Sequence, residues 1–176
     1  MFTPQYPLTD FPAGTTTVDM RPLEAIMDLH KACSSGPPSA VRKALANPFS
    51  DVTKPNCDEF GIYPLYAACS TTNVASGFVT EICDILIAKG AKINQINDGD
   101  ARLFPLFRVC AQHRSLKLAR YFVEKGANVN LSNGAGMTSL HMAGNHKLSD
   151  VVAFLLESGA SVDQTCDNNC NALIIL

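Results

Sequence analysis

A group of cysteines and histidines near the end of the sequence has the composition of a metal site. Cys166 and Cys170 are separated by three residues, and His141 and His146 precede them. Thiolate and imidazole are ligands that zinc prefers, and four of them complete its tetrahedral shell. A structural role competes with zinc, because the two cysteines fall one sequence unit after His141. We favour the structural role and expect no metal or other cofactor.

The sequence offers little evidence of other catalytic motifs. Gly134-Ala135-Gly136 begins like a dinucleotide-binding loop but lacks the third glycine and a preceding strand. The sequence contains no Cys-x-x-Cys pair, His-Glu-x-x-His, Gly-x-Ser-x-Gly or phosphate loop ending in Gly-Lys-Ser/Thr. We therefore predict no enzyme within residues 1–176.

The cysteine usage indicates a reducing compartment. The seven cysteines are an odd number, and their spacing is not that of a disulfide framework. Most stand in helical patterns, where a free cysteine behaves as a small apolar residue. The first residues also lack the basic and apolar regions of a signal peptide. These features predict a cytoplasmic protein, with the nucleus as the alternative.

Charge and hydropathy exclude two classes of partner. The chain has 14 Lys and Arg against 16 Asp and Glu, which gives a net charge of −2. A protein without excess cations has little with which to neutralise phosphates, so we expect no nucleic-acid binding. No apolar run approaches the roughly 20 residues of a membrane span, so we expect no membrane insertion.

The chain is organised by a repeated phrase. Lys-Gly-Ala-Lys-Ile-Asn at residues 89–94 returns as Lys-Gly-Ala-Asn-Val-Asn and as Ser-Gly-Ala-Ser-Val-Asp. The glycines of the three copies are Gly90, Gly126 and Gly159. Apolar residues at i, i+3 and i+4 precede each glycine, as in Ile82, Ile85 and Leu86. Each copy therefore predicts the end of an amphipathic helix, with glycine as its stop.

A second phrase alternates with the first and marks helix starts. Tyr-Pro-Leu-Tyr-Ala-Ala at 63–68 corresponds to Phe-Pro-Leu-Phe-Arg-Val, Thr-Ser-Leu-His-Met-Ala and Asn-Ala-Leu-Ile-Ile-Leu further along. Proline suits the first helical position, where its missing N–H needs no partner. Tyr63 and Phe104 replace the threonine that can cap such a helix, as Thr138 can.

These phrases, with a period of about 33 residues, resemble the Thr-Pro-Leu-His-x-Ala signature of the ankyrin repeat family over residues 21–176. The resemblance implies an all-α fold, an ankyrin-repeat solenoid of stacked helix-turn-helix units with finger loops. It also implies that His141, and His30 at the same position, bond to the backbone of a neighbouring loop.

The predicted organisation follows the repeat. The second unit has six more residues than the third complete one, and they fall between its helices around Ser70–Val79. The apolar ending after residue 171 predicts that the natural protein continues. The predicted segments are a leader at 1–20, flexible or docked through its aromatic residues, an atypical capping repeat at 21–57, repeats at 58–97, 98–132 and 133–166, and a truncated repeat at 167–176.

The resemblance implies binding of another protein or peptide segment through a concave groove and the finger loops. The apolar residue before each helix start faces that groove, and the exposed stripe is either bound by a partner or covered by this chain. Acidic fingertips (Glu59, Asp98, Asp100 and Asp167) favour a partial basic character in the partner. The predicted partner-binding residues are Phe60, Ile62, Arg102, Leu103, Arg108, Gln112, Met137, Asn145 and His146.

The favoured function is a non-catalytic interaction module, serving as a scaffold, adaptor or targeting region of a larger intracellular protein. One alternative is the N-terminal regulatory region of a multidomain enzyme whose catalytic domain lies beyond residue 176. Another is a fixed structural subunit of a large assembly, where a partner permanently buries the apolar stripe.

Overall fold

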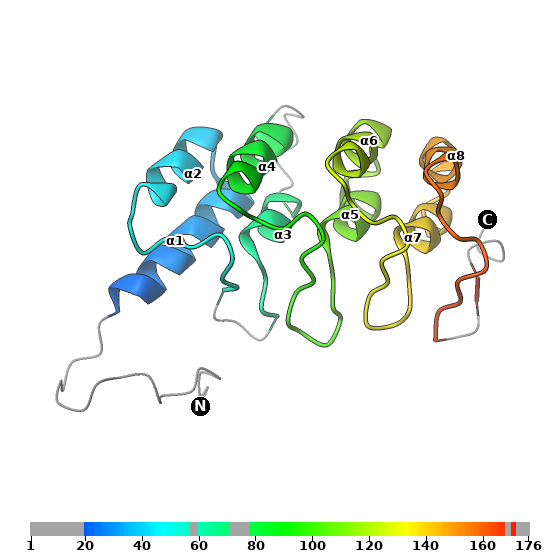
Figure 1. Cartoon of the computed structure of the whole chain (residues 1–176), viewed down its shortest axis with the longest axis horizontal. Coiled ribbons are helices and arrows are strands. Elements are labelled where there is room, and N and C mark those ends of the chain that lie inside the picture. The colour runs from blue at the N-terminus through cyan, green and yellow to red at the C-terminus, as the bar shows by residue number, and fades with distance from the viewer. Residues whose placement is uncertain (1–19, 57–59, 71–77, 168–169, 172–176) are drawn as a thin grey trace.

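The computed structural model describes residues 20–56, 60–70, 78–167 and 170–171. In this part of the chain the helices stack in two layers, with loops extending from one side (Figure 1). The helices are α1 (Arg21–Ser35), α2 (Pro38–Leu45), α3 (Pro64–Ala68), α4 (Phe78–Ala88), α5 (Pro105–Arg108), the π turn η2 (Val109–His113), α6 (Leu116–Glu124), α7 (Ser139–Asn145) and α8 (Ser149–Glu157). The predicted all-α solenoid of helix pairs is confirmed.

Neighbouring pairs bury one continuous core. Within the inner layer, α1 contacts α3, α3 contacts α5, and α5 contacts α7, while in the outer layer α2 contacts α4 and α6 contacts α8. A leucine occupies the same position near the start of α3, α5 and α7, and in α1, and each is at most 1 % exposed. These leucines are Leu29, Leu65, Leu106 and Leu140. The repeated sequence phrase is thus the pattern of side chains that the core requires.

The inner helices begin as the sequence predicts. Pro64 and Pro105 occupy the first turn of α3 and α5. Thr138 caps α7 by accepting from the His141 backbone N–H, whereas Tyr63 and Phe104 provide no side-chain cap. The two degenerate units therefore lack a cap worth about 1 kcal/mol.

The outer helices end at the predicted glycines. Gly90, Gly126 and Gly159 have φ of 97°, 91° and 87°. In this left-handed region glycine pays no Cβ penalty, so the chain can turn from the helix into the next finger.

Two inner helices, α1 and α7, are each joined to the loop of the next unit by one histidine. His141 Nε2 lies 3.1 Å from the Cys170 carbonyl oxygen, and His30 Nε2 lies 2.7 Å from the Ile62 carbonyl oxygen. The other ring nitrogen of His141 bonds with Thr138. The predicted role of the two histidines is confirmed.

The third unit contains a feature that the sequence pattern did not indicate. After α5 the helix widens into the π turn η2, which Arg114 ends at a φ of 49° while its N–H donates to the Val109 carbonyl. In this π turn the consecutive side chains Gln112 and His113 bond to two consecutive carbonyls. Gln112 donates to the Ser70 carbonyl, and His113 donates to the Cys69 carbonyl. These bonds satisfy acceptors at the end of α3 that the helix itself leaves unpaired.

Several sequence predictions fall on residues outside the described ranges. Residues 1–19 of the leader and 172–176 at the end are among them. So are residues 71–77, although the end of α3 at Ala68 and the start of α4 at Phe78 do place the predicted insertion between two helices. The unit boundaries stay predictions.

The histidine tie gives a stability prediction. His141 is fully buried, so His141→Ala removes its bonds and leaves the Cys170 carbonyl without this donor. We expect a loss of about 2 kcal/mol or more in the free energy of unfolding. Urea unfolding followed by circular dichroism measures it, because the chain has no tryptophan. The exposed Lys117→Ala is the control, and equal stability of the two variants would contradict the proposed tie.

The buried thiols give a reactivity prediction. Burial raises the pKa of Cys33 and of Cys110 to about 12, and it raises that of Cys69 as well. A thiol that stays protonated is a poor nucleophile. We expect iodoacetamide at pH 8 to label these three cysteines and buried Cys83 at least roughly tenfold more slowly in the folded protein than in urea.

Mass spectrometry of tryptic peptides reads that labelling site by site. The half-buried Cys166 and Cys170 are the internal comparison. Rapid labelling of the four buried thiols in the native protein would show that the core opens far more readily than its packing implies.

Candidate functional site

The finger loops are hairpins closed at their base by backbone hydrogen bonds. In each of these loops, the carbonyl at the end of the finger accepts from the backbone N–H at its start. These bonds join Asn56 to Ile62 (2.8 Å), Asn97 to Leu103 (2.8 Å), Asn133 to Met137 (2.9 Å) and Cys166 to Cys170 (3.0 Å). Each predicted groove residue is thus held where a finger meets an inner helix.

Adjacent fingers are joined along the solenoid. The Gly99 N–H donates to the Phe60 carbonyl, and the Gly134 N–H donates to the Ala101 carbonyl. A Cβ on Gly134 would lie 2.2 Å from the Asp100 carbonyl oxygen, so glycine is required for this approach. The fingers therefore form one connected edge.

A small apolar pocket lies where the first two of these fingers meet. Four of the nine predicted partner-binding residues line it, together with one aromatic residue from α3 and parts of the second finger. Its lining residues are Phe60, Ile62, Tyr66, Asn97, Gly99, Ala101, Arg102 and Leu103. Its volume of about 70 Å³ is that of several waters, given that one water needs about 10–15 Å³ of such space. This corresponds to the side chain of a valine or leucine.

Arg108 in α5 lies beside this pocket, and Gln112 follows it in η2. The Arg108 guanidinium carbon is 5.8 Å from the centroid of the Tyr66 ring, and Tyr66 lines the pocket. Gln112 donates from Nε2 to the Ser70 carbonyl over 3.0 Å. The structure therefore brings five of the nine predicted residues together on two successive units, whereas Gln112 bonds to the end of α3.

The acidic fingertip residues are partly engaged. The Tyr63 hydroxyl donates to Asp98 over 3.2 Å, whereas Asp100 and Asp167 are exposed. Glu59 lies outside the described residues. The finger edge thus combines carboxylates with one exposed cation, Arg102.

Comparison with known proteins agrees with the repeat. A family model described as ankyrin repeats in three copies matches residues 73–166, which is more than half of the chain. The chain belongs to the ankyrin repeat family.

Similar proteins carry such repeats within longer chains. The NAD-dependent deacetylase sir2B of Dictyostelium discoideum is 28 % identical over 57 % of this chain and 13 % of its own. The rice BTB/POZ domain and ankyrin repeat-containing protein NPR3 is 41 % identical over 33 % of this chain and 10 % of its own. The putative ankyrin repeat protein FPV230 of fowlpox virus is 34 % identical over 35 % and 32 %. The chain matches less than a third of the length of each.

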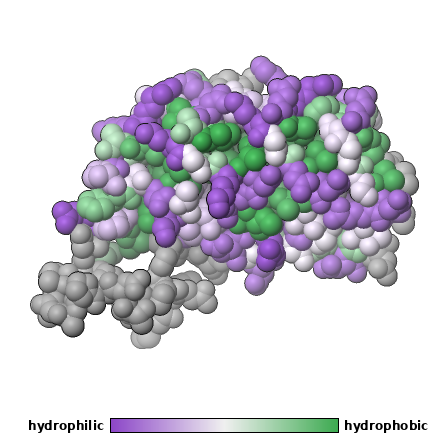
Figure 2. Space-filling model, viewed as in Figure 1, coloured by the Kyte–Doolittle hydropathy of each residue, from purple (hydrophilic) through white to green (hydrophobic). Residues whose placement is uncertain are grey.

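The ankyrin groove is less exposed than the sequence analysis predicts. Ile62, Leu103 and Met137 are half-buried and pack against the core, while Phe60 is 56 % exposed. These three apolar positions are thus partly covered by this chain itself, and their part in partner binding stays a prediction. They are covered because the finger-base bonds hold their backbone against the inner helices. In keeping with this, Figure 2 shows apolar areas interrupted by polar ones over the visible face.

The last three predicted residues lie away from the pocket. Met137, Asn145 and His146 belong to the unit of α7, with Asn145 exposed and His146 half-buried. They do not line the apolar pocket. Their part in binding stays a prediction.

Sequence reasoning missed four lining residues, Tyr66, Asn97, Gly99 and Ala101, of which the first two are the larger. Tyr66 occupies the histidine position of the repeat, and an aromatic residue there was a usable signal. Asn97 is 5 % exposed, and its Oδ1 accepts from the Tyr63 N–H over 3.2 Å. Asparagines at the base of three fingers, residues 56, 97 and 133, were the corresponding signal.

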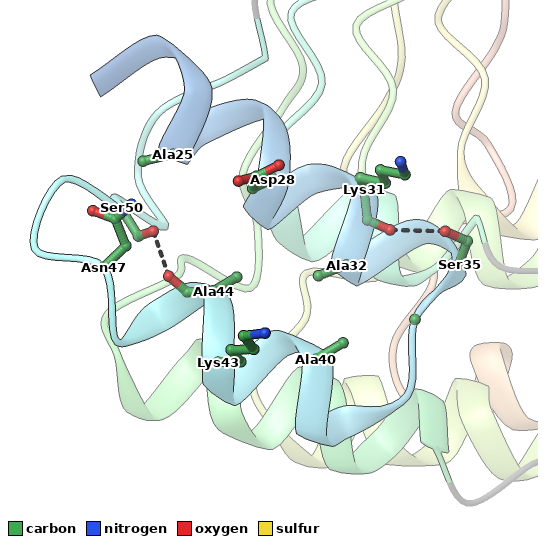
Figure 3. Close-up of a pocket in the computed structure, with 11 residues that line it drawn as sticks. Ala25, Asp28, Lys31, Ala32, Ser35, Ala40, Lys43, Ala44, Asn47 and Ser50 are labelled. Atoms are coloured by element: carbon green, nitrogen blue, oxygen red, sulfur yellow. Dashed lines mark hydrogen bonds between the residues drawn. The ribbon is translucent and has the colours of Figure 1, made fainter. Parts of the chain in front are cut away.

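A larger hollow lies elsewhere, between α1 and α2 (Figure 3). It measures about 500 Å³. Small side chains such as Ala32, Ala40 and Ala44 face it, and Asp28, Lys31 and Lys43 surround them. None of the nine predicted partner-binding residues lines this hollow. The hollow is an indentation between two helices at this end of the ankyrin stack.

Neither metal chemistry nor membrane insertion is supported by the described residues. Both ring nitrogens of His141 are engaged, and no group of three or more His, Cys, Asp or Glu is placed to hold a metal within the described ranges. None of the helices there combines the length and the apolar character needed to cross a bilayer.

The backbone at Arg102 gives a matched prediction. Its φ of 46° lies in the left-handed region, which costs a residue with a Cβ roughly 1–2 kcal/mol. We therefore expect Arg102→Gly to be about 1 kcal/mol more stable than Arg102→Ala, the reverse of the order at an ordinary position. Parallel urea titrations measure the difference. Greater stability of the alanine variant would contradict the strained backbone.

Proposed function

We propose that this ankyrin region is a cytoplasmic protein-interaction module of a scaffold, adaptor or targeting protein. It binds a partner segment where the first two described fingers meet the inner helices. The observation that carries this proposal is the apolar pocket lined by Phe60, Ile62 and Leu103. Ankyrin repeats are in general protein-interaction modules, and four of the nine predicted residues line this pocket.

The physical basis is local burial. Phe60 is 56 % exposed beside a pocket of side-chain size, so a partner side chain inserted there removes apolar surface of both molecules from water. Phenylalanine and arginine are residue types enriched in protein interfaces. The carboxylates Asp98 and Asp100 on the finger favour a partner with basic groups outside its apolar anchor.

A second candidate function comes from one of the similar proteins. The similarity to the NAD-dependent deacetylase sir2B extends over 57 % of this chain. An ankyrin region of this kind can therefore serve as the regulatory part of an enzyme whose catalytic domain lies outside residues 1–176. Sequencing the transcript beyond codon 176, with an assay of the encoded protein for NAD-dependent deacylation, separates this candidate from a plain adaptor.

The proposed function predicts the effect of charge in the pocket. Ile62→Asp and Leu103→Asp place a carboxylate in an apolar site, and Phe60→Asp does so at a mostly exposed position that leaves the core intact. We expect each to reduce recovery of specific partners from cell extracts by at least roughly tenfold, since an unpaired buried charge costs more than 1.4 kcal/mol. Quantitative mass spectrometry of the captured proteins measures recovery.

Leu156→Asp on α8 is the matched control, because Leu156 is also exposed but lies in the outer layer. Circular dichroism confirms that each variant is folded. If the folded Phe60→Asp and Leu103→Asp proteins recover the same partners as the control, the pocket is not the binding site.

A further inference from the structure

Arg108 is a cation without a carboxylate partner. Within the described part of the chain, the ion pairs are Arg42 with Glu81 and Lys125 with Asp84, and none includes Arg108. Its side chain is half-buried, and its Nε is enclosed by protein without a hydrogen-bond partner. The Tyr66 ring and hydroxyl replace part of the hydration that this guanidinium loses, but its Nε has no hydrogen-bond partner among the described residues. Such a group is suited to receive an anion from another molecule.

The segment that carries Arg108 is held in place. Gln112 and His113 in η2 donate to the Ser70 and Cys69 carbonyls. Burial lowers the pKa of His113, and the nearby Arg108 charge lowers it further against the opposing hydrogen bond to Cys69. His113 is therefore neutral near pH 7, so the positive charge at this site belongs to Arg108.

Tyr66 connects this cation with the apolar pocket. Its ring lines the pocket, and the guanidinium of Arg108 lies over the same ring at 5.8 Å. An aliphatic side chain in the pocket and an anion at Arg108 are thus within reach of one short peptide. The finger carboxylates Asp98 and Asp100 lie on the opposite side of the pocket from Arg108 and repel an acidic residue of the peptide there. This repulsion sets the direction in which the peptide binds.

We propose that Arg108 binds an aspartate or glutamate side chain of the partner while a leucine or isoleucine from the same segment fills the pocket. This inference rests on the proposed function and names the partner's chemistry. An internal acidic side chain suits the site, because the fingers continue along the solenoid beyond the pocket on the side of α7, so that a bound segment passes through (Figure 1).

Peptide display on the purified 176-residue protein tests it. Two libraries of random 12-residue peptides are used, one with the peptide inside a carrier loop and one with a free C-terminal carboxylate. We expect the first to enrich sequences that combine Leu or Ile with Asp or Glu. Arg108→Met, which keeps the length of the side chain, removes the acidic preference and retains the aliphatic one.

Affinity measurements on one enriched peptide give the magnitude. A charge-assisted hydrogen bond to a guanidinium corresponds to a roughly tenfold to 100-fold loss of affinity for Arg108→Met. Replacing the peptide's acidic residue by its amide causes a similar loss with the wild type and little further loss with Arg108→Met. Thermal unfolding of Arg108→Met is expected at or above the wild-type temperature, whereas a structural role would lower it.

The outcomes separate the two proposals. If binding of the enriched peptides requires Ile62 but is unaffected by Arg108→Met, the proposed acidic side chain is rejected. The same holds if the peptides bind Arg108 through a C-terminal carboxylate. In both cases the proposed interaction module is still supported. Failure to enrich any peptide sensitive to Ile62→Asp counts against the module itself, and the role of Arg108 fails with it.

Discussion

The structure depends on the stacking of short helices that are not stable alone. Apart from α1, with 15 residues, the helices in the described part of the chain have between 4 and 11 residues. Isolated helices below roughly 12–15 residues are marginal in water. Each pair is therefore ordered by the apolar face of its neighbour, which explains why leucine recurs at the same inner-helix position. The helix starts, the glycine stops and the finger bonds all serve to align one face with the next.

This constraint explains where the units can vary. The stack needs the leucine, the glycine stop and a closed finger, but the residue at the histidine position only has to occupy the space beside the next finger. His30 and His141 do so with a hydrogen bond to a carbonyl, whereas Tyr66 and Phe107 do so as buried aromatic rings. The second solution places an apolar wall beneath the first two fingers. Tyr66, where the unit of α3 departs from the repeat, forms part of the pocket wall.

Sequence periodicity predicted the features that every unit must share. Gly90 and His141 could be placed because a helix stop and a tie to the next loop recur with the repeat. The positive φ of Arg102 and the π turn could not be predicted from the sequence. Each occurs in one unit only and depends on how the length of its loop fits the neighbouring units. The same limit applies to exposure: Leu103 is apolar and precedes a helix, but the finger-base bond decides that it is half-buried.

The two degenerate units differ from the unit of α7 at the start of their inner helices. Tyr63 and Phe104 supply no side-chain cap, and Arg102 occupies a costly conformation. The unit of α7 has both a capping box and a histidine tie. In a stack that is stabilised by neighbours, a weak pair is maintained by the stronger pair beside it. A partner that binds across α3 and α5 would therefore stabilise the part of the solenoid whose inner helices lack a side-chain cap, and binding and folding of these units would be thermodynamically linked.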